Sequence, residues 1–198
     1  IQSEAEGLTN GLSGAAAQAG EFLYADLNGD GIIDPFGKDR TIIGDPNPDF
    51  TASFTLDISY KNWDLSALFN GSFGAEIANI NRFSTGAGGG QVSNLLQRWS
   101  PDNRSTNFPS LRQNRNVAFS DFWIEDASFL RLQNLRVGYN FTKEQIKFAN
   151  SAKIYFSGDN LVNFTNYSGV DPEVNLQGTD GNLVPRLRRF SLGLEFTF

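Results

Sequence analysis

The sequence contains no cysteine, no histidine and no methionine in its 198 residues. Without cysteine and histidine, these residues cannot form disulfide bonds, zinc sites built on those ligands, thiol nucleophiles or Ser-His-Asp triads. Because the sequence starts at Ile1 and has no methionine, we expect a matured protein or a piece of a longer chain.

Charge is also scarce. Only 19% of the residues are charged, against about 25% in an average soluble domain. The 16 basic residues are outnumbered by 22 acidic ones and form no basic run, so nucleic acid is not an expected partner. No stretch reaches the roughly 18 consecutive apolar residues that predict a transmembrane helix.

Aromatic residues and glycine are plentiful instead. Aromatics make up 13% of the chain, with 18 Phe, and there are 20 Gly. Together with the low charge, this composition favours an all-β protein. An outer-membrane barrel fits, since its strands are segments of about ten residues in which polar and apolar side chains alternate.

Five segments show this alternation. In the first of them Phe54, Leu56 and Ile58 fall on one face, and Ser and Thr residues fall on the other. The predicted strands are Phe50–Tyr60, Trp63–Phe73, Ser128–Phe141, Lys153–Asn163 and Arg188–Phe198. The first two form a hairpin. Within the third, Leu130 and Leu132 are out of phase with Leu135, which predicts a bulge or a strand leaving the apolar band.

The connections between these strands alternate in length. Short turns are expected at residues 61–62 and 142–152, the latter with a helical turn at Lys143–Ile146, and long connections at residues 1–49, 74–126 and 164–187. In a barrel, short turns are periplasmic and long loops extracellular. Residues 1–49 are therefore predicted to be an extracellular loop, with a short strand at Glu21–Tyr24. A helical turn is expected at Asn94–Trp99.

Residues 50–198 are predicted to be the last strands of the barrel. The final one ends on Phe198, as outer-membrane barrels commonly do. Five strands fall short of the roughly eight needed to close a barrel, so these strands belong to a larger one.

Oxygen-bearing side chains follow one another at alternate positions near the start of the chain. A Ca²⁺-type or similar divalent-cation loop would use the side chains of Asp26, Asn28, Asp30 and Asp34 and the carbonyl of Ile32. Relative to an EF-hand loop, Gly37 replaces the bidentate Glu, and Asp39 is a possible substitute. Such a cation would be structural. The alternative is an Asx-rich turn with no ion.

No catalytic pair stands out, so we do not expect an enzyme. The carboxylates of Glu125 and Asp126, or of Asp171 and Glu173, are close in sequence, but nothing in the spacing selects either pair. The basic residues Arg131, Arg136 and Arg189 fall on the polar strand face, where we expect them to be solvated or ion-paired. Aromatics near strand ends fit membrane-interface girdles, or a surface that stacks on glycans: Tyr60, Trp63, Trp123, Phe164 and Tyr167.

Several stretches together resemble the C-terminal part of the SusC/RagA family of TonB-linked outer-membrane transporters. They are residues 26–34, 39–50, 60–74, 122–139, 160–173 and 185–198, and they include the sequence Thr-Asn-Tyr-Ser-Gly-Val-Asp-Pro-Glu at 165–173. The resemblance spans nearly the whole chain and depends on the order and spacing of these stretches.

The resemblance implies a barrel of about 22 strands in the outer membrane of a Gram-negative bacterium. It also implies partners: the remainder of the same barrel and its plug, outer-membrane lipid, a SusD-like surface lipoprotein that acts as a lid, and TonB, which engages the N-terminal part outside this sequence. Such systems import glycans or peptides. Two other readings stay open, an accessory barrel in a larger surface assembly and a soluble Ca²⁺-dependent carbohydrate-binding β-domain.

Overall fold

The regular structure of the described residues is almost entirely β-strand. The computed structural model describes residues 9–10, 15–16, 20, 22, 24–34, 36–80, 98–104, 108–110, 118–146, 148–173, 178–180 and 184–198. The chain divides into two compact units. One is made of residues 1–44 and 79–124, and the other of residues 45–78 and 125–198. Within the described residues, no helix is long and apolar enough to cross a membrane.

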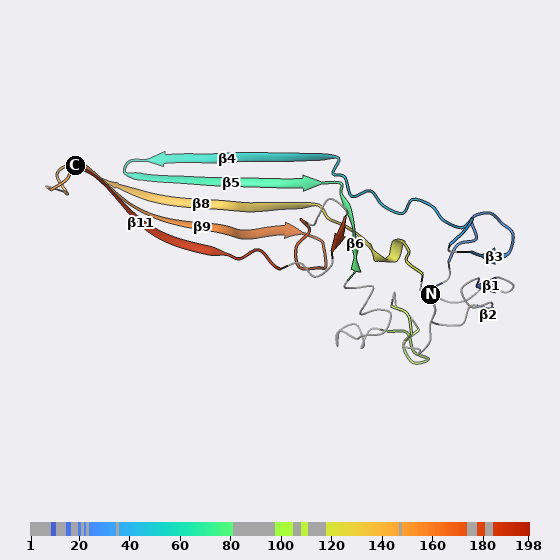
Figure 1. Cartoon of the computed structure of the whole chain (residues 1–198). Helices are drawn as coiled ribbons and strands as arrows, with labels where there is room; N and C mark the ends of the chain where they lie inside the picture. The colour runs from blue at the N-terminus through green and yellow to red at the C-terminus, as the bar shows by residue number, and fades with distance from the viewer. Residues whose placement is uncertain are drawn as a thin grey trace. The chain divides into compact units, whose positions relative to one another are not determined.

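A five-stranded antiparallel sheet dominates the second unit (Figure 1). Its order is β11-β9-β8-β5-β4, and its strands are β4 (Phe50–Tyr60), β5 (Trp63–Phe73), β8 (Phe129–Phe141), β9 (Ser151–Thr165) and β11 (Arg189–Thr197). All five predicted strands are confirmed, and β9 is two residues longer at each end than predicted. The expected turn after β8 is present, since the amides of Gln145 and Ile146 both donate to the carbonyl of Thr142.

The predicted bulge lies at Gln133. On one side of β8, Leu132 pairs with Phe69 and Asn134 with Leu68, so the register skips Gln133. The register toward β9 is also interrupted between Leu132 and Asn134. Because one residue is skipped, Leu132 returns to the face occupied by the apolar residues that follow it on β8. The reversed phase in the sequence therefore results from a β-bulge within one continuous strand.

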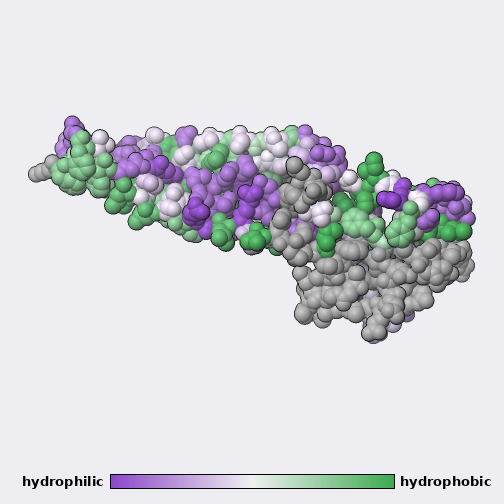
Figure 2. Space-filling model, viewed as in Figure 1, coloured by the Kyte–Doolittle hydropathy of each residue, from purple (hydrophilic) through white to green (hydrophobic). Residues whose placement is uncertain are grey.

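The two faces of the sheet differ in character. On one face the large side chains are apolar and between 44% and 72% exposed: Phe54, Leu56, Ile58, Phe156, Phe190, Leu192, Leu194 and Phe196. Stacked pairs join neighbouring strands, with ring centroids 4.7 Å apart for Phe54 and Phe69. Hydrophilic side chains also gather over part of the sheet (Figure 2). A contiguous exposed apolar face of this kind marks a protein or membrane contact.

A second, three-stranded sheet has the order β10-β6-β7. Its strands are β6 (Glu76–Asn79), β7 (Ile124–Asp126) and β10 (Thr179–Asp180). These strands correct the prediction that residues 74–126 and 164–187 are long connections that contain no strand. Segments of two to four residues are too short for an alternation of polar and apolar side chains to be recognised in the sequence. Such strands are defined only by the strands with which they pair.

The first unit contains β1 (Thr9–Asn10), β2 (Ala15–Ala16) and β3 (Ile32–Ile33), in the order β2-β1-β3, and the 3₁₀ turn η1 (Asp121–Trp123). The strand predicted at 21–24 is not formed at Phe22 or Tyr24, the two of these residues that the structure describes. The Phe22 ring instead packs on Phe122 and Trp123, at centroid distances of 4.9 and 5.8 Å. Most of the helical turn predicted at 94–99, residues 94–97, lies outside the described residues.

Candidate functional site

The polar face of the five-stranded sheet carries ion pairs between neighbouring strands. Near the end where β4 turns into β5, the Nζ of Lys153 lies 2.9 Å from the Oδ2 of Asp64, and the amide of Asn140 donates to the Oδ1 of Asp64 at 2.8 Å. Gly138 lies between them, and a Cβ there would lie 2.5 Å from the Cε of Lys153. Glycine at 138 therefore lets the lysine cross the strand to reach its partner.

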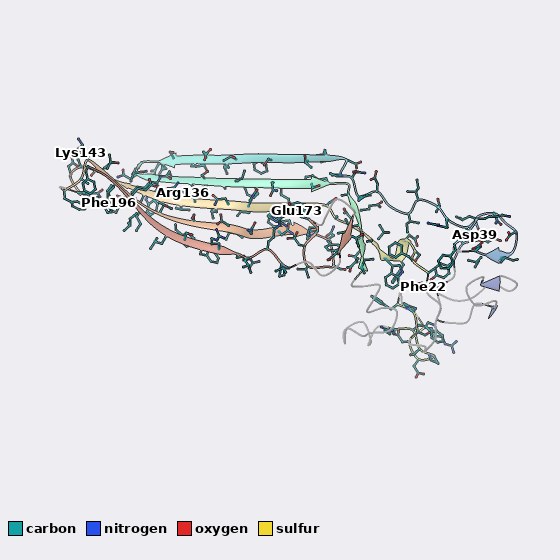
Figure 3. All side chains as sticks on the ribbon, in the orientation of Figure 1. Phe22, Asp39, Arg136, Lys143, Glu173 and Phe196 are labelled. Atoms are coloured by element: carbon teal, nitrogen blue, oxygen red, sulfur yellow. The ribbon has the colours of Figure 1, made fainter. Side chains whose placement is uncertain are left out.

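Arg136 lies on β8, the middle strand of the sheet (Figure 3). Its guanidinium forms an ion pair with Glu195 and lies 3.8 Å from the ring centroid of Tyr155. A Cβ at Gly193 would lie 2.2 Å from the Cζ of Tyr155, so this ring needs glycine beneath it. The arginine is therefore held by two interactions, the ion pair with Glu195 and a cation–π contact with the Tyr155 ring.

A cluster of four charged side chains lies on the polar face beyond Arg136, and we call it the charge quartet: Arg131, Asp171, Glu173 and Arg186. Arg131 donates to Asp171 and Glu173, each at 2.7 Å. Arg186 reaches the same two carboxylates, at 3.5 and 2.7 Å. The side chains of Arg131 and Asp171 are only 4% and 9% exposed. The expectation that the strand-face arginines are ion-paired is confirmed for Arg131 and Arg136.

Tyr167 and Asp180 form a buried pair of hydrogen-bonded side chains. The Tyr167 hydroxyl donates to the Oδ2 of Asp180 at 2.6 Å, and Asp180 is fully buried. Tyr167 also packs with Ala75, Ile77 and Ala127 in a small apolar core. Burial, followed by the hydrogen bond to Asp180, raises the pKa of Tyr167 well above its ordinary value of 10.0.

This pair predicts a loss of stability in alkaline solution. A tyrosine whose folded pKa exceeds its unfolded value of about 10 stabilises the fold below pH 10, and that contribution falls as the pH rises further. We expect the free energy of unfolding of the full protein to drop above pH 10, and to drop less in a Tyr167→Phe variant. Denaturant unfolding at a series of pH values measures this. An identical alkaline slope in both proteins would contradict the prediction.

None of the carboxylate pairs considered from the sequence forms an acid–base pair. Asp171 and Glu173 do converge, but both are bound by arginines. Glu125 accepts two hydrogen bonds from Ser168, whereas Asp126 accepts the amide of Ser128. The sequence reasoning missed Arg186 and Asp180, because their partners lie 13 or more residues away and no local pattern marks them.

The acidic loop at 26–34 is built on hydrogen bonds to its own backbone. Both carboxylate oxygens of Asp26 accept amides, those of Gly29 and Gly31, at 2.7 Å each. Both glycines have φ near +80°, a region that other residues rarely adopt. The side chain of Asn28 accepts the amide of Asp30 at 2.8 Å. These contacts form the Asx turns of the alternative interpretation.

Asp39 closes the same loop. Its carboxylate accepts the amides of Leu27 and Asp34, at 2.9 and 2.6 Å. The bond from the Asp34 amide is the main reason that the pKa of Asp39 lies below its ordinary value. No group of three acidic side chains gathers in cation-binding geometry in the described part of the chain. At least one side-chain oxygen of each of Asp26, Asn28, Asp30 and Asp34 already accepts a backbone amide. Cation binding by these four residues and Ile32 therefore stays a prediction.

The aromatic residues divide into two groups. Tyr60, Trp63 and Phe164 are between 53% and 66% exposed near the strand ends, as a girdle requires. Trp123 and Tyr167 are 1% and 6% exposed, so the prediction that they belong to a girdle or a stacking surface is wrong. Both pack inside the fold, a distinction that their positions in the sequence cannot reveal.

The curated proteins to which this chain is similar in sequence are TonB-dependent receptors. The chain is 37% identical to TonB-dependent receptor P3 of Formosa agariphila over 94% of its own length and 20% of the relative's. It is 31% identical to TonB-dependent receptor SusC of Bacteroides thetaiotaomicron over 90% of its length and 18% of SusC. No family model matches. The chain thus spans about a fifth of these curated relatives.

Solved structures show the same fold. The RagAB peptide transporter superposes on 79% of this chain with a TM-score of 0.68 and 30% sequence identity, covering 18% of the matched chain. The RagAB peptide importer in its open-open state gives a TM-score of 0.65 over 77% of this chain, and 17% of the matched chain. The five-stranded sheet therefore corresponds to part of a known barrel.

Proposed function

Since this chain belongs to the SusC/RagA family of TonB-dependent receptors, we propose that it forms part of a nutrient importer in the outer membrane of a Gram-negative bacterium. The observation that carries the proposal is the two-faced sheet. One face presents exposed apolar side chains and the other carries ion pairs. A strand in a transmembrane barrel needs this division, because lipid-facing and lumen-facing side chains alternate.

The two edge strands support the same proposal. In the sheet that the structure describes, β4 and β11 each pair with one neighbouring strand. Open edges of this length are covered or paired in stable proteins, and barrels remove them by closure. We propose that the remainder of the barrel pairs with β4 and β11, and that a plug fills the lumen against the polar face.

The substrate class and the lid are finer parts of the proposal. RagAB is described as a peptide importer, and SusC as a TonB-dependent receptor. We propose that this protein takes up an oligomeric nutrient, a glycan or a peptide, with a SusD-like lipoprotein as the lid and TonB supplying energy. The protein itself carries out no bond-breaking chemistry in this scheme.

Uptake by cells tests this function. Cells that carry or lack the gene for the full protein are supplied with fluorescent glycan or peptide oligomers, and uptake is measured with and without TonB. We expect uptake of one class of oligomer, glycan or peptide, to be lost both in cells that lack the gene and in cells that lack TonB. Normal uptake of every oligomer in the mutant that lacks the gene would overturn transport and favour an accessory barrel.

For the acidic loop we propose weak structural binding of Ca²⁺, with Kd about 10⁻⁴–10⁻³ M, as in extracellular modules. In the full protein, 10 mM Ca²⁺ should then slow amide exchange at residues 26–34 by about tenfold or more. Asp30→Asn should abolish this effect. Asp45→Asn is the matched control, because Asp45 also accepts a backbone amide in an Asx turn, that of Asn47. Exchange independent of Ca²⁺ would leave only the turn without an ion.

A further inference from the structure

The charge quartet joins parts of the chain that are distant in sequence. Arg131 lies on β8 in the interior of the sheet, and the other three members lie in the connection from β9 to β11. Asp171 and Glu173 follow the end of β9, and Arg186 precedes the start of β11. Both ends of this connection therefore meet at the two carboxylates that the buried guanidinium of Arg131 binds.

A local turn also holds the two carboxylates in position. The Oδ1 of Asp171 accepts the backbone amide of Glu173 at 3.0 Å, with Pro172 between them. This local turn aims both side chains at Arg131, so a single arginine bonds to both at 2.7 Å. Planar guanidinium groups suit such double recognition, whereas a lysine offers only a point charge.

From this geometry we propose that the quartet is a charge clamp that fixes the β9–β11 connection onto the polar face of the sheet. Arg131 is its buried positioning residue, and Arg186 closes it from the more exposed side, where its side chain is 46% exposed. Two positive and two negative charges balance within the clamp. The parts of the connection that the structure describes next to the clamp, residues 166–173 and 184–188, are consequently held against the polar face of the sheet.

Contacts on either side of the clamp support a fixed connection. Ser168 donates to Glu125 through its backbone amide and its hydroxyl, at 2.9 and 2.8 Å. The carbonyl of Gly178 accepts the amide of Ala78 at 2.8 Å and so extends the pairing of β10 with β6. Moving these residues away from the sheet would break these bonds. It would also expose Asp171 to solvent or leave it buried without its partner Arg131.

Hydrogen exchange in the full-length protein tests the clamp, with the amides of residues 166–173 as the readout. Arg131→Gln leaves the buried Asp171 without its inner partner, and removing one member of a buried ion pair is strongly destabilising. We expect exchange in this segment to accelerate by about 100-fold or more. Arg136→Gln is the matched control, since it removes an arginine of the same strand from a more exposed ion pair, and should leave the segment unchanged.

A second variant keeps the test informative if Arg131→Gln does not assemble. Arg186→Gln changes a half-exposed side chain, and we expect exchange at residues 168–173 to rise by about three- to tenfold although the change lies 13 residues beyond Glu173. Exchange within about twofold of the wild type in Arg186→Gln, or in an assembled Arg131→Gln protein, would overturn the clamp. Because the readout is local order, this result does not depend on transport.

Discussion

Arginine in place of Leu192 is expected to destabilise the assembled protein by about 2–4 kcal/mol. Leu192 lies near the middle of β11, is 72% exposed in the described part of the chain, and pairs with Phe156 on the apolar face. If this face contacts lipid, a charge there must sit in the hydrocarbon region or distort the bilayer around it. Denaturant unfolding of the full-length protein in lipid vesicles measures the loss.

The neighbouring residue supplies the control. Ser191 lies on the polar face, where it pairs with Ser157, and Ser191→Arg places the same charge one residue away on the opposite side of the sheet. We expect a change within about 0.5 kcal/mol for this variant. Equal destabilisation by the two arginines would mean that the apolar face is covered by something other than lipid.

Replacing Tyr167 with phenylalanine is expected to cost about 1.5–3 kcal/mol of stability. The change removes one hydroxyl and keeps the ring, so packing against Ala75 and Ile77 is preserved. The loss comes from Asp180, which is fully buried. Its Oδ2 accepts the Tyr167 hydroxyl, and its Oδ1 has no hydrogen-bond partner. A buried carboxylate that loses its partner bears its full desolvation cost.

Two further variants separate this cause from a general effect of the lost hydroxyl. Tyr155→Phe removes a hydroxyl from the polar face and keeps the ring on which Arg136 stacks, so it should be nearly neutral. In the double variant Tyr167→Phe, Asp180→Leu, most of the loss should be recovered, because no carboxylate remains to be buried. A double variant less stable than Tyr167→Phe would assign the loss to packing instead.

The long strands could be predicted from sequence because each carries its own signal. Alternation over nine or more residues is visible without knowing the partner strand, and it placed β4 and β5 at their observed ends. The reversed phase of Leu130 and Leu132 even indicated the irregularity now found at Gln133. Neither β6 nor β10 carries such a signal, because a strand of two to four residues is defined only by what it pairs with.

By itself, then, the sequence determined the all-β class, the five long strands, the division of their side chains between two faces, and the family resemblance. All of these depend on residues near one another in the chain. Only the tertiary structure decided that Arg131 meets Asp171, that Tyr167 meets Asp180, and that Trp123 is buried. Strand pairing and connections that fold back bring such residues together across 13 to 40 positions, and composition and periodicity carry no information about contacts at that separation.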